Sequence, residues 1–247
     1  MKNFTLSEVL ICLVVIGIIS ITIVPIIIQR YDEKVTIAKV KNAYFILSEA
    51  YSKAITENGG GLEEWKCFNR NTGGILGGKC IMDELSKHLN IINKSSKGKD
   101  NIPYSLNKQD NTINNYTKMT SFKLSNGFII KISEHSAGCY TYEKWKDIDS
   151  IERFSCQIFV DINGEKGPNA LGRDVFGFKI HNTKIAGLGN TTEPYYTFQR
   201  MCNISKTNDI WDGNTNGSAC TAWILENDNM DYLHCSNLSW TGKRKCN

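Results

Sequence analysis

One uninterrupted apolar stretch stands near the start of the chain. From Val9 to Ile28, twenty consecutive residues carry no charge. A helix rises 1.5 Å per residue, so this stretch spans about 30 Å, the thickness of a bilayer's hydrocarbon core. The pattern predicts a membrane-spanning helix. Pro25 predicts a kink in it, because proline lacks an N–H group and its ring clashes with the preceding turn.

The helical pattern continues past the apolar stretch in an amphipathic form. Apolar residues recur at steps of three and four with charged residues between them, which predicts a helix whose apolar stripe packs on a folded domain. Asn58 and the glycines at 59–61 predict its end. We therefore expect one helix from about Phe4 to about Asn58. The stripe comprises Ile37, Val40, Tyr44, Leu47, Tyr51 and Ala54.

The rest of the chain, 59–247, shows short alternating runs separated by turn residues. This pattern predicts an α+β fold in which the long amino-terminal helix packs on a mostly antiparallel β head. A short helix is expected at Ile81–Leu89 and a polar loop at Asn93–Asp100. The expected strands are Thr120–Leu124, Gly127–Ser133, Gln157–Asp161, Val175–Ile180 and Ala222–Glu226.

The chain has nine cysteines, whose number and spacing indicate the redox compartment of the protein. Cys12 lies in the apolar stretch, which leaves an even number in the head without a Cys-x-x-Cys spacing or enough histidines for a zinc site. We expect four disulfides in an oxidising compartment; unpaired buried thiols are the alternative. Sequential pairing is expected because short loops close most easily. The expected pairs are Cys67–Cys80, Cys139–Cys156, Cys202–Cys220 and Cys235–Cys246.

The cysteines also set the expected orientation of the membrane segment. The apolar stretch is longer than a signal-peptide core and no Ala-x-Ala-like cleavage site follows it, so it predicts a retained anchor with the head on the oxidising side.

Charge and motifs favour a structural protein over an enzyme or a nucleic-acid binder. The net charge of +4 is small against 29 basic and 25 acidic residues, so no nucleic-acid partner is predicted. The four histidines are scattered, and the glycine-rich stretch Asn71–Lys79 lacks the Lys-Ser/Thr end of a phosphate loop. No catalytic residue or required cofactor is predicted. The histidines are His88, His135, His181 and His234.

Glu8 stands at the entrance of the apolar stretch. A carboxylate in a membrane segment is costly unless it is paired, so it is a functional candidate. The sequence Phe4-Thr5-Leu6-Ser7-Glu8, followed by an apolar helix with a proline toward its end, resembles the amino-terminal segment of type IV prepilins and of type II secretion pseudopilins. The resemblance covers about the first thirty residues, or somewhat over fifty with the extended helix.

The resemblance implies processing and assembly. A prepilin peptidase would cut between Asn3, where the family usually has glycine, and Phe4, whose new amino terminus would be methylated. Residues 1–3 would be the leader, 4–29 the transmembrane and assembly helix, and 30–58 its amphipathic continuation. Glu8 would pair with a free Phe4 amine, on its own or a neighbouring subunit, and Pro25 would be the helix-bending proline.

The partners implied by the resemblance are other pilin or pseudopilin subunits, the peptidase, an inner-membrane assembly platform and the lipid bilayer. The chain would cross the inner membrane once, with its head in the periplasm or outside the cell. The long, cysteine-rich head favours a minor or accessory subunit of a pilin-like filament.

A second dense stretch of polar residues, 161–174, has two interpretations. Its oxygen-bearing side chains include those that calcium prefers, although the twelfth position is Gly172 and not the glutamate of an EF-hand. The same residues also cap turns in a polar loop between two strands. The calcium candidates are Asp161, Asn163, Glu165, Asn169 and Asp174.

A membrane-tethered binding or adhesion module that does not polymerise is the alternative function. Its ligand surface would use Trp211, Trp223 and Trp240, which otherwise fit a buried core.

Overall fold

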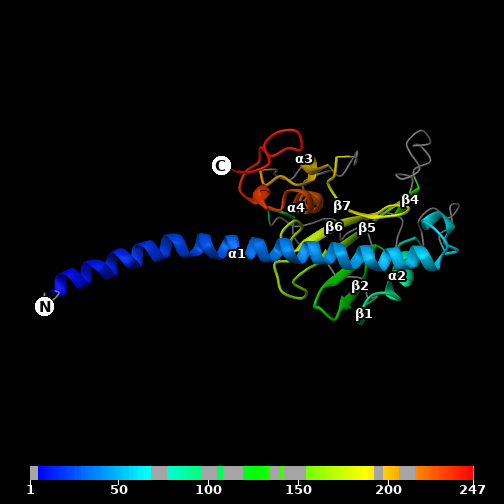
Figure 1. The fold of residues 1–247 in the computed structure, drawn as a ribbon, viewed down its shortest axis with the longest axis horizontal. Coiled ribbons are helices and arrows are strands. Elements are labelled where there is room, and N and C mark those ends of the chain that lie inside the picture. The colour runs from blue at the N-terminus through cyan, green and yellow to red at the C-terminus, as the bar shows by residue number, and fades with distance from the viewer. Residues whose placement is uncertain are drawn as a thin grey trace.

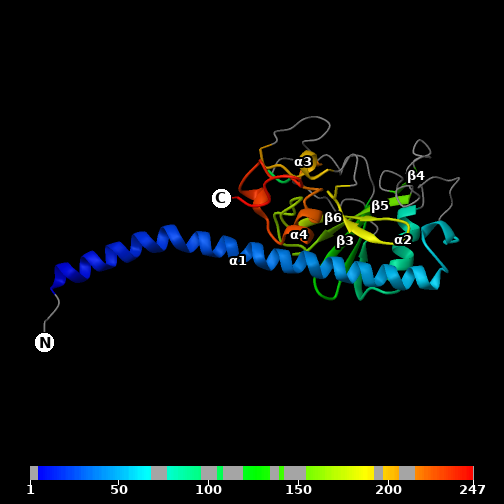
Figure 2. The same cartoon turned by 45° about the horizontal axis from the view of Figure 1, so that its top comes forward.

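A single long helix organises the molecule. The computed structural model describes residues 5–67, 77–95, 105–107, 119–133, 139–141, 154–191, 197–205 and 215–246. Helix α1 (Leu6–Glu57) has 52 residues; its amino-terminal part projects alone and the remainder lies along the head (Figure 1). The projecting part is bent relative to the rest in a second view (Figure 2). Pro25 lies inside α1 without interrupting it.

The expected amphipathic stripe is the face that α1 buries. Seven residues of α1 are buried, five of them from the expected stripe, and the sixth stripe residue, Tyr44, is partly buried with its ring stacked 6.5 Å from that of Phe178. The helix ends where the sequence predicts, because Asn58 is its C-cap and Gly59 follows with φ 76°. The buried residues are Ile37, Val40, Ala43, Leu47, Ala50, Tyr51 and Ala54.

The head is a mainly antiparallel sheet flanked by short helices. Its strands are β1 (Ile91–Ser95), β2 (Met119–Leu124), β3 (Ile129–Ser133), β4 (Cys139–Thr141), β5 (Phe154–Asp161), β6 (Val175–Ile180) and β7 (Ile185–Gly187). The strand order is β1-β2-β3-β5-β6-β7, and β4 pairs with the first part of β5. The short helices are η1 (Leu62–Glu64), α2 (Gly77–Ser86), α3 (Phe198–Met201), α4 (Thr221–Asn227) and η5 (Asp231–Leu233).

One face of this sheet forms the main core together with α1. Strand register places Ile132, Ile158 and Phe178 side by side across β3, β5 and β6. These residues are buried in the same cluster as the α1 stripe. Because side chains alternate along a strand, the register directs one full set of apolar residues toward the helix. The α+β class predicted from the sequence is confirmed.

Several local predictions were wrong. Ala222–Glu226 is not a strand but most of α4, which ends at Asn227 and is capped by Asp228 in a left-handed conformation. A short apolar run has the same appearance in a buried helix and in a buried strand. Part of the expected loop 93–100 belongs to β1, and α2 begins four residues earlier than Ile81. Strands β4 and β7 were not predicted.

Three of the expected disulfides are present: Cys67–Cys80, Cys202–Cys220 and Cys235–Cys246. For the fourth, Cys156 is disulfide-bonded and its backbone lies opposite that of Cys139 in the β4–β5 pair. The side chain of Cys139 is outside the described residues. Cys12, in the projecting helix, is a free thiol.

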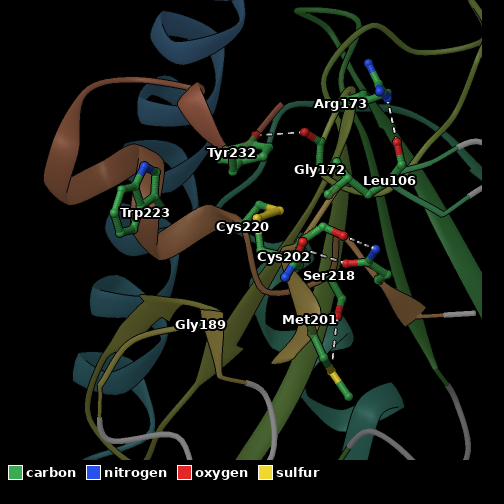
Figure 3. The surroundings of a disulfide bond; sticks show 12 residues. Leu106, Gly172, Arg173, Gly189, Met201, Cys202, Ser218, Cys220, Trp223 and Tyr232 are labelled. Atoms are coloured by element: carbon green, nitrogen blue, oxygen red, sulfur yellow. Dashed lines mark hydrogen bonds between the residues drawn. A yellow bond between two sulfur atoms is a disulfide. The ribbon is translucent and has the colours of Figure 1, made fainter. Parts of the chain in front are cut away.

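The Cys202–Cys220 bond lies at a crowded crossing of chain segments (Figure 3). Gly172 has φ 72°, and a Cβ atom there would lie 2.9 Å from the Cys220 Sγ, so the position requires glycine. The buried Tyr232 hydroxyl donates to the Gly172 carbonyl at 2.7 Å. The loop that follows β5 is thereby fixed to the carboxyl-terminal part of the head.

Candidate functional site: the projecting helix and its junction with the head

The projecting part of α1 is an apolar surface without a partner in the single chain. Its most apolar 18-residue window has no buried residue, and α1 is the one helix in the described part of the chain that is long and apolar enough to cross a membrane. Its hydroxyl groups are satisfied locally, since Ser20 donates to the Ile16 carbonyl and Thr22 to the Ile18 carbonyl. This helix therefore suits a lipid or helix-packed environment.

Glu8 lies in the first turn of this helix and forms a capping box with Thr5, the N-cap residue. The Thr5 hydroxyl oxygen accepts a hydrogen bond from the Glu8 N–H at 3.4 Å, and the Glu8 carboxylate accepts one from the Thr5 N–H at 2.7 Å. The sequence could have predicted this pairing of Glu8 with Thr5, because Thr5-Leu6-Ser7-Glu8 fits the Ser/Thr-x-x-Glu signature of a capping box. The expectation for Glu8 considered only a partner beyond the helix and missed this one.

The capping box uses one oxygen of the Glu8 carboxylate. Oε2 accepts from both the Thr5 N–H (2.7 Å) and the Thr5 hydroxyl (2.8 Å). Oε1 accepts no hydrogen bond from the described residues, so an additional donor can bind there without opening the helix start. Asn3 and Phe4, the residues expected at the cleavage point, lie outside the described residues.

The second half of α1 is joined to the head by buried polar contacts as well as by its apolar stripe. The Tyr51 hydroxyl lies within hydrogen-bonding distance of two consecutive carbonyl oxygens, 2.7 Å from that of His181 and 3.0 Å from that of Asn182. Burial raises the pKa of Tyr51. The hydroxyl therefore stays protonated and serves as a donor.

Ionisable pairs join α1 to the head along much of its length. Glu33 and His234 are at the junction, Lys41 and Asp228 lie further along, and Glu57 and His88 are at the far end. The nitrogen–oxygen distances are 2.7 Å for Glu33–His234, 2.7 Å for Lys41–Asp228 and 3.2 Å for Glu57–His88. The helix is thus held at both ends of its packed half.

The structure brings together four of the five calcium candidates in the loop after β5. Asp174 accepts hydrogen bonds from the Asn163 side chain (3.1 Å) and from the Asn169 N–H (2.8 Å). The Asn169 amide, oriented as a donor, lies 3.2 Å from Asp161 Oδ2. Glu165 is apart from this cluster and pairs with Lys123 at 3.0 Å.

The charges of this loop are balanced inside the protein. Lys131 is buried, and its Nζ lies 3.8 Å from Asp161 Oδ2. Burial raises the pKa of Asp161 to about 6, an effect that Lys131 opposes, and burial also raises the pKa of Asp174. N–H groups and an ammonium group thus face the carboxylates where a cation would bind. One buried acceptor, Asn163 Oδ1, has no hydrogen bond in the described part.

This geometry matches the turn-capping interpretation of the loop. No group of three or more His, Cys, Asp or Glu side chains within the described ranges is placed to hold a metal ion. Calcium binding at 161–174 stays a prediction of the sequence.

The same loop lies beside α1 where the helix leaves the head. A groove of about 710 Å³ has Pro25 and Ile28 of the helix on one side, and Ile162 and Asp174 of the loop with Met230 on the other. The loop therefore contributes to the surface next to the apolar segment, a position that its sequence did not reveal.

The tryptophans weighed for a ligand surface do not form one in the described part. Trp223 and Trp240 are buried, with ring centroids 5.0 Å apart, and Phe198 stacks on Trp223 at 4.1 Å. Trp211 lies outside the described residues, as does His135. The remaining histidines are dispersed over the head, with His181 buried under Tyr51.

Comparison with protein-family models, with curated proteins and with solved structures found no match to this chain.

Proposed function

We propose that this protein is a pilin-like or pseudopilin-like structural subunit of a type IV pilus or a type II secretion filament. It is cleaved before Phe4, spans the inner membrane through α1 with the head in the periplasm or outside the cell, and assembles through this helix. Its partners are other subunits, the prepilin peptidase and the inner-membrane assembly platform. It has no catalytic activity of its own in this proposal.

The observation that carries the proposal is that one half of α1 is packed on the head while the other half is exposed and apolar. The carboxyl-terminal half buries its apolar stripe against the head, whereas the amino-terminal half exposes apolar side chains along its whole length. A soluble protein does not leave such a surface uncovered. Lipid can cover it before assembly, and the helices of neighbouring subunits can cover it within a filament.

Glu8 gives this helix a means of specific pairing. Its Oε1 remains open to a donor while Oε2 completes the capping box. In an apolar surrounding an amine from a neighbouring Phe4 would bind Glu8 through a charge-assisted hydrogen bond, which is stronger than a neutral one. This pairing distinguishes an assembly helix from a simple anchor.

Mass spectrometry of the mature amino terminus tests the processing step. We expect a chain that begins with N-methylated Phe4 when the protein is produced with a prepilin peptidase. An intact Met1 under those conditions would contradict the proposal. Replacing Asn3 by glycine, the residue usual in the family, is expected to raise the processed fraction, and replacing Lys2 by glycine serves as the matched control.

Fractionation separates filament assembly from the tethered-module alternative. A filament subunit is recovered with sheared surface filaments or with a purified pseudopilus. A chain found in the membrane fraction alone, with residues 1–3 retained, would support a tethered binding module.

A further inference from the structure

A second groove opens at the junction between α1 and the carboxyl-terminal part of the head. It has a volume of about 770 Å³. The helix contributes residues from Ile26 to Lys34, and the head contributes residues from Asn227 to Cys246. Figure 1 shows the carboxyl-terminal end of the head beside α1 at the place where the helix begins to project.

The carboxylates of this groove have partners within the protein. One is paired with a histidine, one with a lysine, and one accepts a backbone N–H. The contacts are Glu33 with His234 (2.7 Å), Asp228 with Lys41 (2.7 Å) and Asp231 with the Cys246 N–H (2.6 Å).

The permanent cations of the groove, unlike its carboxylates, have no such partners among the described residues. Arg30, Lys34 and Lys245 line it, and none of the three forms an ion pair or side-chain hydrogen bond with another described residue. Lys34 and Lys245 are exposed. The Cys235–Cys246 disulfide fixes the neighbour of Lys245 and thereby keeps this lysine beside the helix. The groove thus brings together three cations from two distant segments, none with an ion-pair partner among the described residues.

The groove also lies at a defined height along the helix. Ile26 belongs to the uncharged stretch, whereas Arg30 and Lys34 follow it. From residue 26 to residue 34 the helix rises about 12 Å. When α1 spans a bilayer, this segment passes from the edge of the hydrocarbon into the headgroup layer, which is roughly 5–8 Å thick on each side. The cations then lie at the level of the lipid phosphates.

We propose that this groove binds the phosphate headgroup of an anionic phospholipid in the leaflet on the side of the head. Arg30, Lys34 and Lys245 are its phosphate ligands, since guanidinium and ammonium groups bind phosphate and basic residues next to a membrane span are attracted to anionic lipid. Ile26 contacts the start of an acyl chain. The inference rests on the membrane-spanning helix of the proposed function. Its consequence is that the membrane-embedded subunit holds its head in one orientation before assembly.

Hydrogen exchange on the full chain in nanodiscs tests this binding. One set of discs contains phosphatidylcholine alone and the other contains phosphatidylglycerol as well. We expect exchange of the backbone amides in 243–246 to be several-fold slower in the anionic discs. The difference should vanish in about 1 M salt, where the Debye length is about 3 Å.

Charge-reversal variants identify the residues responsible. In Lys34→Glu/Lys245→Glu the slowing by anionic lipid should be lost. The matched control Lys66→Glu/Lys184→Glu makes the same charge change at exposed positions near the opposite end of the head and should retain it. The milder variant Lys245→Gln, which should weaken the slowing, covers the case in which the double reversal does not fold.

The outcomes separate the two levels of the proposal. A chain that is released from the discs by alkaline carbonate is not membrane-spanning, which would contradict the proposed function itself. A chain that stays embedded but exchanges equally in both kinds of disc refutes the headgroup site alone. Slowing that depends on the number of chains per disc and not on the lipid would assign the groove to a protein partner and also refute it.

Discussion

Replacing Glu8 by glutamine separates its observed role in the capping box from its proposed pairing with a neighbouring amine. The glutamine side chain keeps a carbonyl oxygen that can accept from the Thr5 N–H, so the capping box is retained while the charge is lost. A charge-assisted hydrogen bond contributes about 1.5–3 kcal/mol. At a factor of ten for each 1.36 kcal/mol, incorporation of Glu8→Gln into filaments should fall roughly 10- to 150-fold.

Two further variants complete the series. Glu8→Ala loses the charge and the carboxylate half of the capping box, so it should incorporate at least as poorly as the glutamine variant. Thr5→Ala loses the cap, worth about 0.5–2 kcal/mol of helix stability, but it keeps the charge and should incorporate nearly normally. Asp32→Asn removes a charge from an exposed position further along α1 and is the matched control.

The assay is competition with a tagged wild-type copy in the same cells. The ratio of variant to wild type is measured by mass spectrometry in sheared filaments and, separately, in the membrane fraction. We expect the membrane ratio to be unchanged for every variant. If Glu8→Gln were incorporated like the wild type while Glu8→Ala and Thr5→Ala failed, Glu8 would act only as a helix cap and the pairing idea would be refuted.

Two predictions concern the stability of the head, measured on the full chain in detergent with its disulfides intact. Tyr51→Phe removes the buried hydroxyl that donates to the His181 carbonyl and should cost about 1–3 kcal/mol, whereas Tyr44→Phe, whose hydroxyl has no hydrogen bond in the described part, should cost far less; equal losses would refute this role of Tyr51. Burial raises the pKa of Asp161 from 3.8 to about 6, so the folded state binds the carboxyl proton more tightly than the unfolded state. Protonation of Asp161 therefore stabilises the folded state at low pH, and this contribution to the free energy of unfolding is lost as the pH rises from about 4 to above 6. The stability of the wild type relative to Asp161→Asn should therefore fall by about 2 kcal/mol from pH 4 to pH 7; a flat difference would contradict the assignment.

The sequence was most informative where structure depends on neighbours along the chain. The long helix, its buried stripe and its end at Asn58 follow from periodicity and glycine, both of which are local signals. Strands β2, β3, β5 and β6 carry alternating or mostly apolar patterns, and the sequence predicted each of them. The three described disulfides close loops of 11 to 18 residues, the short closures that chain entropy favours.

The sequence was least informative where contacts are long-range. Nothing in the local pattern of Ala222–Glu226 shows that the segment is buried as a helix, because this depends on its packing against α1 and β7. Glu33 and His234 are 201 residues apart, so no spacing rule brings them together. The junction of helix and head, with both of its grooves, is therefore a property of the tertiary structure.

The placement of the disulfides has a mechanical consequence. Cys67–Cys80, Cys202–Cys220 and Cys235–Cys246 all close loops within the head, and the one cysteine of α1 is a free thiol, so none of these bonds ties the helix to the sheet. In a filament under tension, load would pass along α1, a rod of about 78 Å. It would reach the head only through packing and hydrogen bonds such as those of Tyr51. Under load the helix and head can part and rejoin reversibly, while the covalently closed loops limit how far the head itself can extend.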